Sequence, residues 1–179
     1  NALIKIKTEK INFYENGTIC KAFVVAIIDT DDIPDSIHMV SKNNYAKHNQ
    51  HYYKVFNEGL TWEEAKQRCK EMGGYLVTIT SKDEQAVVQN LVFVNGDKNY
   101  YWTGGFRIEN DNWAWITGEK FSYSNWCEGE PNNGVGNENI ITLYTSGLWN
   151  DCPAEGISDK PHLKFFNAKN SGFICEWDS

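Results

Sequence analysis

The chain has 179 residues, of which 41% are hydrophobic and 23% charged, a composition typical of globular domains. We therefore expect one domain with an appendage, and disordered, collagenous and low-complexity proteins are excluded. The net charge of −7, without a long basic stripe, predicts that nucleic acid is not a partner. The apolar runs are shorter than the ~18–20 residues of a membrane span, so we expect no membrane insertion.

The cysteines indicate an oxidising compartment. None of the five belongs to a C-x-x-C pair, so zinc knuckles and thioredoxin-type redox sites lose their sequence signal. Disulfides are the better interpretation, and they predict a secreted or cell-surface protein. No signal peptide precedes Asn1, which we interpret as a mature form or an excised piece. Because the number of cysteines is odd, at least one of them is expected to have no disulfide partner within the chain.

The first 50 residues are expected to precede the main domain. Residues 1–30 hold two strand-like runs around Asn16-Gly17, a pair typical of hairpin turns, and predict a β-hairpin appendage or the tail of an upstream domain. Such a hairpin is marginal alone, so it docks on the main domain, pairs with another chain, or belongs to a truncated neighbour. Residues 31–50 are polar and are interpreted as a linker. The main domain is expected over 51–179.

Two amphipathic helices open the main domain. Residues 61–64 form a capping box before a helix that ends at Gly73-Gly74, and residues 81–84 begin a second helix. A short strand is expected between them over 75–79. Beyond Asn99 the helical period gives way to short aromatic strands broken by turns. This order, helices first and strands after, predicts an α+β fold.

Carboxylates and side-chain amides are concentrated in residues 125–139 and 147–151, which are rich in Gly and Asn. Calcium takes six to eight such oxygen ligands at ~2.3–2.6 Å, whereas zinc would require His or Cys. Three acids against one divalent ion leave about one negative charge, and amides add ligands without repulsion. The candidate ligands are Glu130, Asn132, Glu138, Asn150 and Asp151.

These residues stand in motifs that resemble the C-type lectin domain family, mannose-type subclass. The resemblance covers about residues 51–177, and the spacings from Glu130 to Glu138 and on to Asn150 agree with it. It implies a C-type lectin-like fold with two helices, short antiparallel sheets and a long calcium-binding loop region. The motifs, in chain order, are Trp62-Glu63-Glu64-Ala65, Tyr101-Trp102-Thr103-Gly104-Gly105, Glu130-Pro131-Asn132, Trp149-Asn150-Asp151 and Phe173-Ile174-Cys175-Glu176-Trp177.

The resemblance also implies how the site works. The five candidate ligands would hold one principal Ca²⁺, with Pro131 in the cis form, and two neighbouring sugar hydroxyls would replace water on the ion. The same five residues would contact the sugar, and Asn133 and Tyr144 are candidates for lining its pocket. The order Glu-Pro-Asn implies mannose, glucose, N-acetylglucosamine or fucose. The expected partners are glycans or glycoproteins on a cell surface, bound by a multidomain surface protein or a multivalent assembly involved in adhesion.

The chain departs from the family pattern at several positions. The resemblance implies a disulfide between Cys69 and Cys175, but the family's next cysteine is replaced by Ile140. Cys127 and Cys152 lie on segments that the same ion would draw together, and they either form a bridge there or remain free thiols. Cys20 is then the odd cysteine, either a buried thiol or a link to a missing neighbour.

Two further departures concern the loops. Residues that build an accessory calcium site in some relatives correspond here to Phe106, Asn110, Asn133 and Asn139, so a second site is expected to be absent or weak. Residues 153–172 are longer than usual, and form either a packed insertion or a loop that shapes the ligand surface.

The tryptophans, the histidines and the acids each allow a second interpretation. The tryptophans at 102, 113, 115, 126 and 149 are expected in the core more than in a sugar-stacking surface. His48 and His51 could bind a metal, but no acid completes an H-E-x-x-H pattern, which favours linker histidines. Glu130 and Glu138 are poor glycosidase acids because a bound cation depresses their pKa, so no enzyme is predicted. The alternative function is an adhesion module that binds a protein or ice, with calcium only structural.

Overall fold

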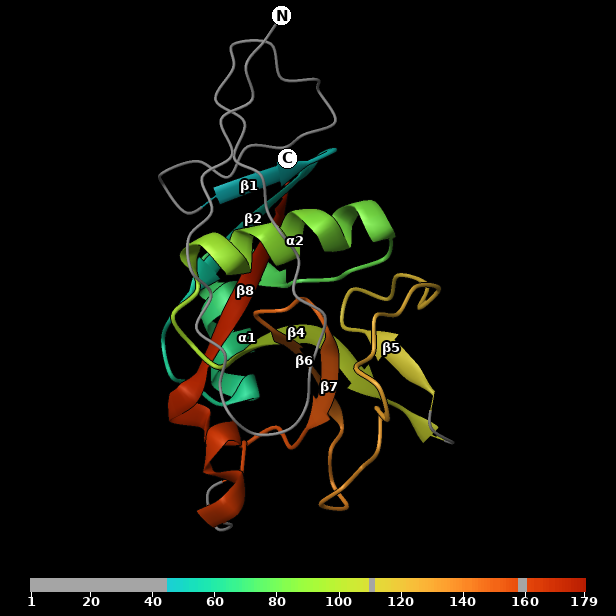
Figure 1. Cartoon of the computed structure of the whole chain (residues 1–179). Coiled ribbons are helices and arrows are strands. Elements are labelled where there is room, and N and C mark those ends of the chain that lie inside the picture. The colour runs from blue at the N-terminus through green and yellow to red at the C-terminus, as the bar shows by residue number, and fades with distance from the viewer. Residues whose placement is uncertain (1–44, 110–111, 158–160) are drawn as a thin grey trace, which may run out of the picture.

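The computed structural model describes residues 45–109, 112–157 and 161–179 (Figure 1). The expected hairpin over 1–30, most of the linker and Cys20 lie outside these residues. The stretch before residue 51 is not all linker, because Tyr45–His48 forms strand β1 and pairs antiparallel with β2, His51–Phe56. The tight turn between them has Asn49 at a φ of 52°. Within the described residues, the sheet of the main domain therefore already includes Tyr45–His48.

Both predicted helices are confirmed. Helix α1, Trp62–Glu71, begins at the N-cap Thr61, whose side chain forms the predicted capping box with Glu64. Gly73 follows its end at a φ of 77°, a conformation that favours glycine. Helix α2, Lys82–Asn95, begins at Ser81, whose hydroxyl accepts from the backbone N–H of Glu84.

The strands form one mixed sheet, where sequence analysis predicted short antiparallel ones. Its order is β1-β2-β8-β4-β6-β7, with β3 added on β8 and β5 on β4. Strands β4 and β8 run parallel, and the other pairs are antiparallel. Hydrophobic pattern does not reveal this parallel pair, because its strands lie far apart in sequence. The remaining strands are β3 (Tyr75–Leu76), β4 (Tyr100–Arg107), β5 (Trp113–Trp115), β6 (Ile140–Tyr144), β7 (Trp149–Cys152) and β8 (Ser171–Asp178).

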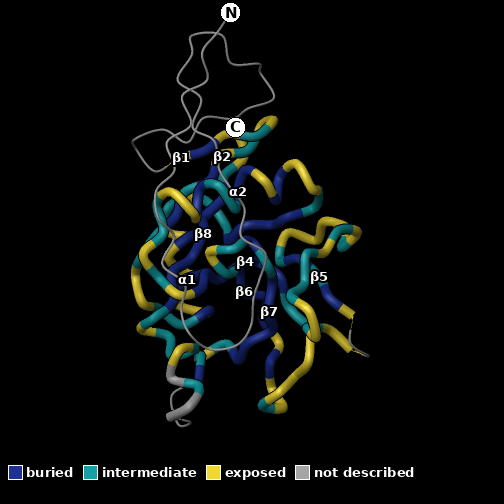
Figure 2. Tube along the Cα trace, in the orientation of Figure 1, coloured by how far each residue is buried: buried dark blue, intermediate teal, exposed yellow. Residues whose placement is uncertain are grey.

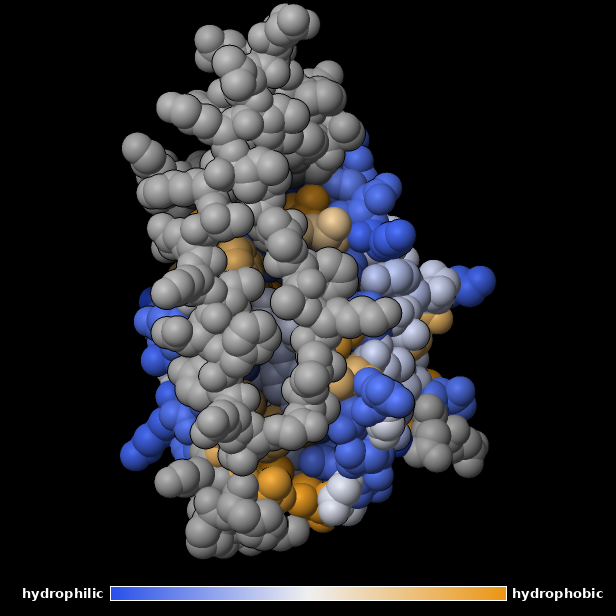
Figure 3. All heavy atoms as spheres, in the orientation of Figure 1, coloured by the Kyte–Doolittle hydropathy of each residue, from blue (hydrophilic) through white to orange (hydrophobic). Residues whose placement is uncertain are grey.

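Each helix covers its own part of the hydrophobic core. Helix α2 contacts β1 and β2, and α1 contacts β3, β4 and β8. The buried segments of Figure 2 follow the strands between them, while Figure 3 shows a mostly hydrophilic surface on the side of β5. Of the tryptophans predicted to be core, Trp126 is half-buried against Trp149, with ring centroids 5.7 Å apart. The other four are buried: Trp102, Trp113, Trp115 and Trp149.

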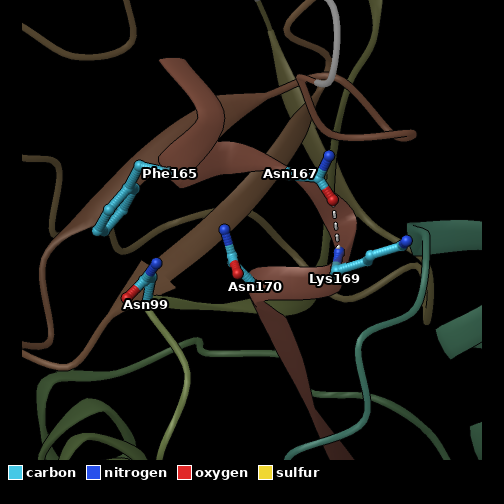
Figure 4. Close-up of a pocket in the computed structure, with 5 residues that line it drawn as sticks. All are labelled: Asn99, Phe165, Asn167, Lys169 and Asn170. Carbon is cyan, nitrogen blue, oxygen red and sulfur yellow. Dashed lines mark hydrogen bonds between the residues drawn. The ribbon is translucent and has the colours of Figure 1, made fainter. Parts of the chain in front are cut away.

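The long segment before β8 is a packed insertion with two short 3₁₀ helices, η2 (Pro161–Phe166) and η3 (Ala168–Asn170). The backbone oxygen of Phe166 accepts from the Tyr100 hydroxyl and from the N–H of Ile157, both at 2.8 Å. An open hollow of about 460 Å³ borders this insertion. Figure 4 shows the side chains that line it. Its lining residues are Asn99, Phe165, Asn167, Lys169 and Asn170. None of the helices in the described ranges has the length and apolar character needed to cross a bilayer.

Candidate functional site

The pairing of β6 with β7 brings the candidate ligands together. Thr142 is the register partner of Asn150, and Ile140 is the partner of Cys152, so Glu138, two residues before Ile140, lies near the end of β7. Glu138, Asn150 and Asp151 are all buried. The loop from Glu130 to Glu138 closes over this strand end. All five candidate ligands therefore meet at one end of the β6–β7 ladder.

The Asp151 carboxylate anchors the loop to β7. Its Oδ1 accepts from the backbone N–H of Asn132 at 3.1 Å, and its Oδ2 accepts from that of Asn133 at 2.9 Å. The Glu130–Pro131 peptide just before these N–H groups is cis, which confirms the form that the family resemblance implies. Asn133 has a φ of 49°, and its side-chain oxygen accepts from the N–H of Glu138 at 3.0 Å. The loop is thereby tied at both ends.

Glu130 holds one buried oxygen without a hydrogen-bond partner in the described part of the chain. Its Oε1 accepts from the Asn132 side-chain amide at 2.7 Å, whereas Oε2 is buried without a hydrogen-bond partner among the described residues. Burial is the largest of the effects that together raise the pKa of Glu130 to about 7; the hydrogen bond and negative charge of Asp151 and the charge of Glu138 act in the same direction. Burial and the Asp151 charge also raise the pKa of Glu138. A cation placed here would relieve both effects.

Sequence reasoning missed Arg107, at the end of β4. Its guanidinium donates to Asp151 Oδ2 at 2.6 Å and, through two nitrogens, to the backbone oxygen of Glu138 at 3.2 and 3.1 Å. It also lies 4.6 Å from the centre of the Trp113 ring. The residue stands two positions after the Trp-Thr-Gly-Gly motif, but its hydrogen-bond partners Glu138 and Asp151 are more than 30 positions away, so nothing local reveals them.

The remaining oxygen ligands fit calcium in kind. The Asn132 side-chain oxygen accepts from the N–H of Gly134 at 2.6 Å and keeps a second lone pair. The Asn150 amide donates to the backbone oxygen of Asp151, an atom that the resemblance assigns to the ion. Carboxylate and amide oxygens are the ligands of a hard cation, and the buried Glu130 Oε2 is such an oxygen without a hydrogen-bond partner among the described residues. The residues present therefore fit a calcium ion.

The two pocket-lining candidates lie in different places. Asn133 lies in the loop itself, beside Asp151. The Tyr144 ring lies 6.3 Å from each of the rings of Phe165 and Phe166, on the side of the insertion. Those contacts place Tyr144 with η2, at the end of β6 away from Ile140.

The cysteines differ in how closely they approach one another. Cys69 on α1 and Cys175 on β8 are buried thiols, and hydrogen bonding to Cys175, followed by burial, raises the pKa of Cys69. The backbone N–H of Cys127 donates to Trp149 in β7 at 2.9 Å. Cys152 is a buried thiol whose pKa is raised first by burial and then by the charges of Glu138 and Asp151. The predicted Cys69–Cys175 pair is thus adjacent.

Comparison with known sequences agrees with this architecture. The family described as Lectin C-type domain matches residues 58–159. The chain is 33% identical over 136 residues to a perlucin-like protein of Mytilus galloprovincialis, which covers 73% of the chain and 79% of that protein. It is 30% identical over 120 residues to human C-type lectin domain family 4 member G, covering 65% of the chain but only 36% of that longer protein.

Solved structures share the fold. The human scavenger receptor C-type lectin carbohydrate-recognition domain is 26% identical with a TM-score of 0.61, covering 78% of this chain and 99% of that one. The carbohydrate-recognition domain of cow CD23, solved in the presence of a GlcNAc2Man3 oligosaccharide, is 22% identical with a TM-score of 0.60, covering 84% and 98%. A calcium-independent type II antifreeze protein is 20% identical with a TM-score of 0.59, covering 79% and 96%. These last two show the fold alone.

The family match spans more than half of the chain, and the Mytilus relative is matched over most of its length. The members of this family are non-enzymatic binding modules that are typically extracellular. Membership of the family supports carbohydrate binding in general. The chain belongs to the C-type lectin domain family.

Proposed function

We propose that this chain binds mannose-type glycans in a calcium-dependent manner, through the loop 130–138 and the end of β7. The observation that supports this most is the unsatisfied, buried Oε2 of Glu130 beside the acids Glu138 and Asp151. Buried polar atoms are nearly always paired, so an unpaired carboxylate oxygen next to two further acids favours a missing cation. The Glu-Pro-Asn sequence of residues 130–132 favours a mannose-type sugar as the ligand.

The proposed ligands divide the work. Glu130, Asn132, Glu138, Asn150 and Asp151 would hold the ion, and Asn132 lies exposed where a sugar can approach. A bound calcium ion supplies a positive centre on which two vicinal hydroxyls replace water. The carboxylates accept hydrogen bonds from the sugar hydroxyls, and the side-chain amides donate hydrogen bonds to the hydroxyl oxygens. Asp151 acts chiefly through the loop that it holds in place.

Sugar preference is proposed to follow the order of donors and acceptors. The Asn132 amide donates to Glu130 Oε1 at 2.7 Å, which fixes the acceptor at position 130 and the donor group at position 132. A hydroxyl pair that fits this order satisfies every partner, whereas a reversed pair leaves polar groups mismatched at ~1–3 kcal/mol each. Equatorial hydroxyls of the mannose class are the proposed match.

The test changes the donor order without changing the shape. Asn132→Asp replaces an amide by a carboxylate of equal size, and Asn137→Asp makes the same change at an exposed position of the same loop. Calorimetry on calcium-loaded protein should give heat with mannose, fucose and N-acetylglucosamine for the wild type and Asn137→Asp. It should give little with galactose, and the mannose heat should be lost in Asn132→Asp.

Other outcomes would redirect the proposal. Calcium binding without any sugar response would favour the alternative module that binds a protein or ice surface. Equal mannose binding by Asn132→Asp and Asn137→Asp would contradict the proposed donor order. Because single sugars bind at only about −4 kcal/mol, or millimolar Kd, cell-surface glycans or glycoproteins would be held by several copies in a secreted or surface-bound assembly.

A further inference from the structure

A second polar cluster lies where β2, β8 and β3 pair side by side. His51 of β2 is the register partner of Asp178 in β8, and Tyr75 of β3 is the partner of Glu176. Glu176 and Asp178 are two residues apart on one strand and so face the same side of the sheet. His51 therefore lies in the paired sheet and not in a linker. The acids Glu176 and Asp178, which contact it, are more than 120 positions away in the sequence and are not found by sequence analysis.

The polar atoms of this cluster approach one another closely. His51 Nδ1 lies 2.8 Å from Glu176 Oε1 and 3.2 Å from Asp178 Oδ1. These three atoms lie within 4.8 Å of one another. The Tyr75 hydroxyl borders the group and donates to Asp178 Oδ1 at 2.6 Å and to Glu176 Oε1 at 3.2 Å.

The cluster combines a deeply buried acid with an open approach. The Glu176 side chain is 1% exposed, and its other oxygen accepts from the N–H of Thr78 at 2.8 Å. The carboxylates of Glu84 and Glu119 lie close enough for their negative charges to act on it. His51 and Asp178 are 32% and 72% exposed, so a hydrated ion can enter from solvent. This deeply buried carboxyl has a histidine as its neighbour.

We propose that His51, Glu176 and Asp178 bind a divalent transition-metal ion of the zinc class. Around a four-coordinate ion with bonds of ~2.0–2.1 Å, neighbouring ligand atoms lie about 3.3 Å apart. The 3.2 Å distance from His51 Nδ1 to Asp178 Oδ1 is close to this value, and the 2.8 Å distance to Glu176 Oε1 would widen by about 0.5 Å on binding. One nitrogen and two oxygens with water in the fourth position suit zinc, whereas calcium prefers six or more oxygens. Tyr75 orients Asp178 as an outer hydrogen-bond donor.

This site is separate from the candidate calcium site. The sheet order places β2 and β8 on one side of β4 and places β6 and β7 on the other. The bound ion would join the end of β8 to the start of β2, two neighbouring strands of the sheet. Its occupancy can therefore be measured whether or not the lectin proposal holds.

The experiment is a zinc titration of the full chain by calorimetry, in saturating calcium. One zinc ion should bind to the wild type, and His51→Ala or Asp178→Asn should weaken binding at least ~10-fold, the scale that even outer-shell changes reach. His48→Ala is the matched control, because His48 is the register partner of His51 in the same hairpin. Asp151→Asn is the control for the calcium loop. Both controls should bind zinc as the wild type does.

Cobalt absorption tests the ligand type, since a tetrahedral N/O site gives strong d–d bands without a sulfur charge-transfer band. Zinc should also raise the unfolding temperature of the wild type but not of His51→Ala. Absent zinc binding, unchanged affinity in His51→Ala, a sulfur charge-transfer band, or loss of binding in Asp151→Asn would each overturn the proposal. Glu176→Gln should also weaken zinc binding. If this variant of a buried residue fails to fold, the variants of the more exposed His51 and Asp178 still test the proposal.

Discussion

At the scale of single residues, Asp151 and Arg107 form the electrostatic centre of the candidate calcium site. The Asp151 carboxylate is fully buried, the Arg107 side chain is 11% exposed, and they are joined at 2.6 Å. Removing one partner of a buried pair leaves the other charge uncompensated, which is far more costly than losing a surface ion pair. Arg107 therefore stabilises the loop whenever calcium is absent.

Arg107→Met should destabilise calcium-free protein by about 3 kcal/mol and calcium-loaded protein by clearly less, because the ion takes over part of the charge compensation. Urea unfolding in EGTA and in calcium measures both values. Arg68→Met is the matched control, since Arg68 is 45% exposed and its contact with Glu58 is 3.7 Å long. That control should change stability by less than ~1 kcal/mol in either condition. An equal loss in EGTA and calcium would contradict this role of Arg107.

Glu130 should make calcium binding sensitive to pH near neutrality. Its pKa is raised to about 7, so the calcium-free carboxyl takes up a proton as the pH falls below that value. Calcium binds the ionised form and must displace this proton, so affinity should fall by up to about tenfold per pH unit below about pH 7. Calcium titrations from about pH 8 to 6 measure the slope. A constant affinity over this range, as an ordinary glutamate would give, would show that the carboxyl is not perturbed.

At the scale of elements, sequence predicts best what neighbouring residues decide. The capping box of Thr61 and Glu64 and the stop at Gly73 lie within a few positions of each other, so α1 is predicted closely. The strand expected over 75–79 is regular only at Tyr75–Leu76. After it, the Val77 N–H still donates to Ile174, but Val77 accepts from Gly104, so one segment links two strands. Such branching depends on tertiary partners that no local pattern contains.

The site shows the same division. Four of the five candidate oxygen ligands stand in two short motifs, with Glu138 between them, and a family resemblance points to all five from sequence. Arg107 and the group around His51 depend on contacts between residues that are distant in the chain, and they emerge only when the strands are paired. The residues near His51 in sequence offer only His48, three positions away, and no acid, which favours a linker. The acids that contact His51, Glu176 and Asp178, lie on β8 and are far away in the sequence.

The adjacency of Cys69 and Cys175 predicts a disulfide that joins α1 to β8. Under oxidising conditions this bond should form, and its reduction should lower stability by about 2–4 kcal/mol, because it closes a long loop. The double variant Cys69→Ala/Cys175→Ala should show no effect of reductant, which serves as the control. Thiol counting of unfolded, unreduced protein tests formation directly. If both thiols react with the reagent before reduction, the bond is absent.

At the scale of the whole molecule, the sheet separates two regions that can be tested independently. The β6–β7 side carries the oxygen-rich loop, and the β2–β8 side carries the histidine cluster. The helices and the core connect them, and the packed insertion contacts Tyr100 of β4 through Phe166. The fold thus presents a polar surface loop on a packed core, as expected of a binding module.

The central claim is that calcium and a mannose-type sugar bind together at the loop 130–138. The most direct measurement is retention of the full chain on immobilised mannan in calcium, with elution by mannose, by galactose or by EGTA. The account predicts retention in calcium, release by mannose and by EGTA, and no release by galactose at equal concentration. Retention that persists in EGTA, or release by galactose as readily as by mannose, would contradict it.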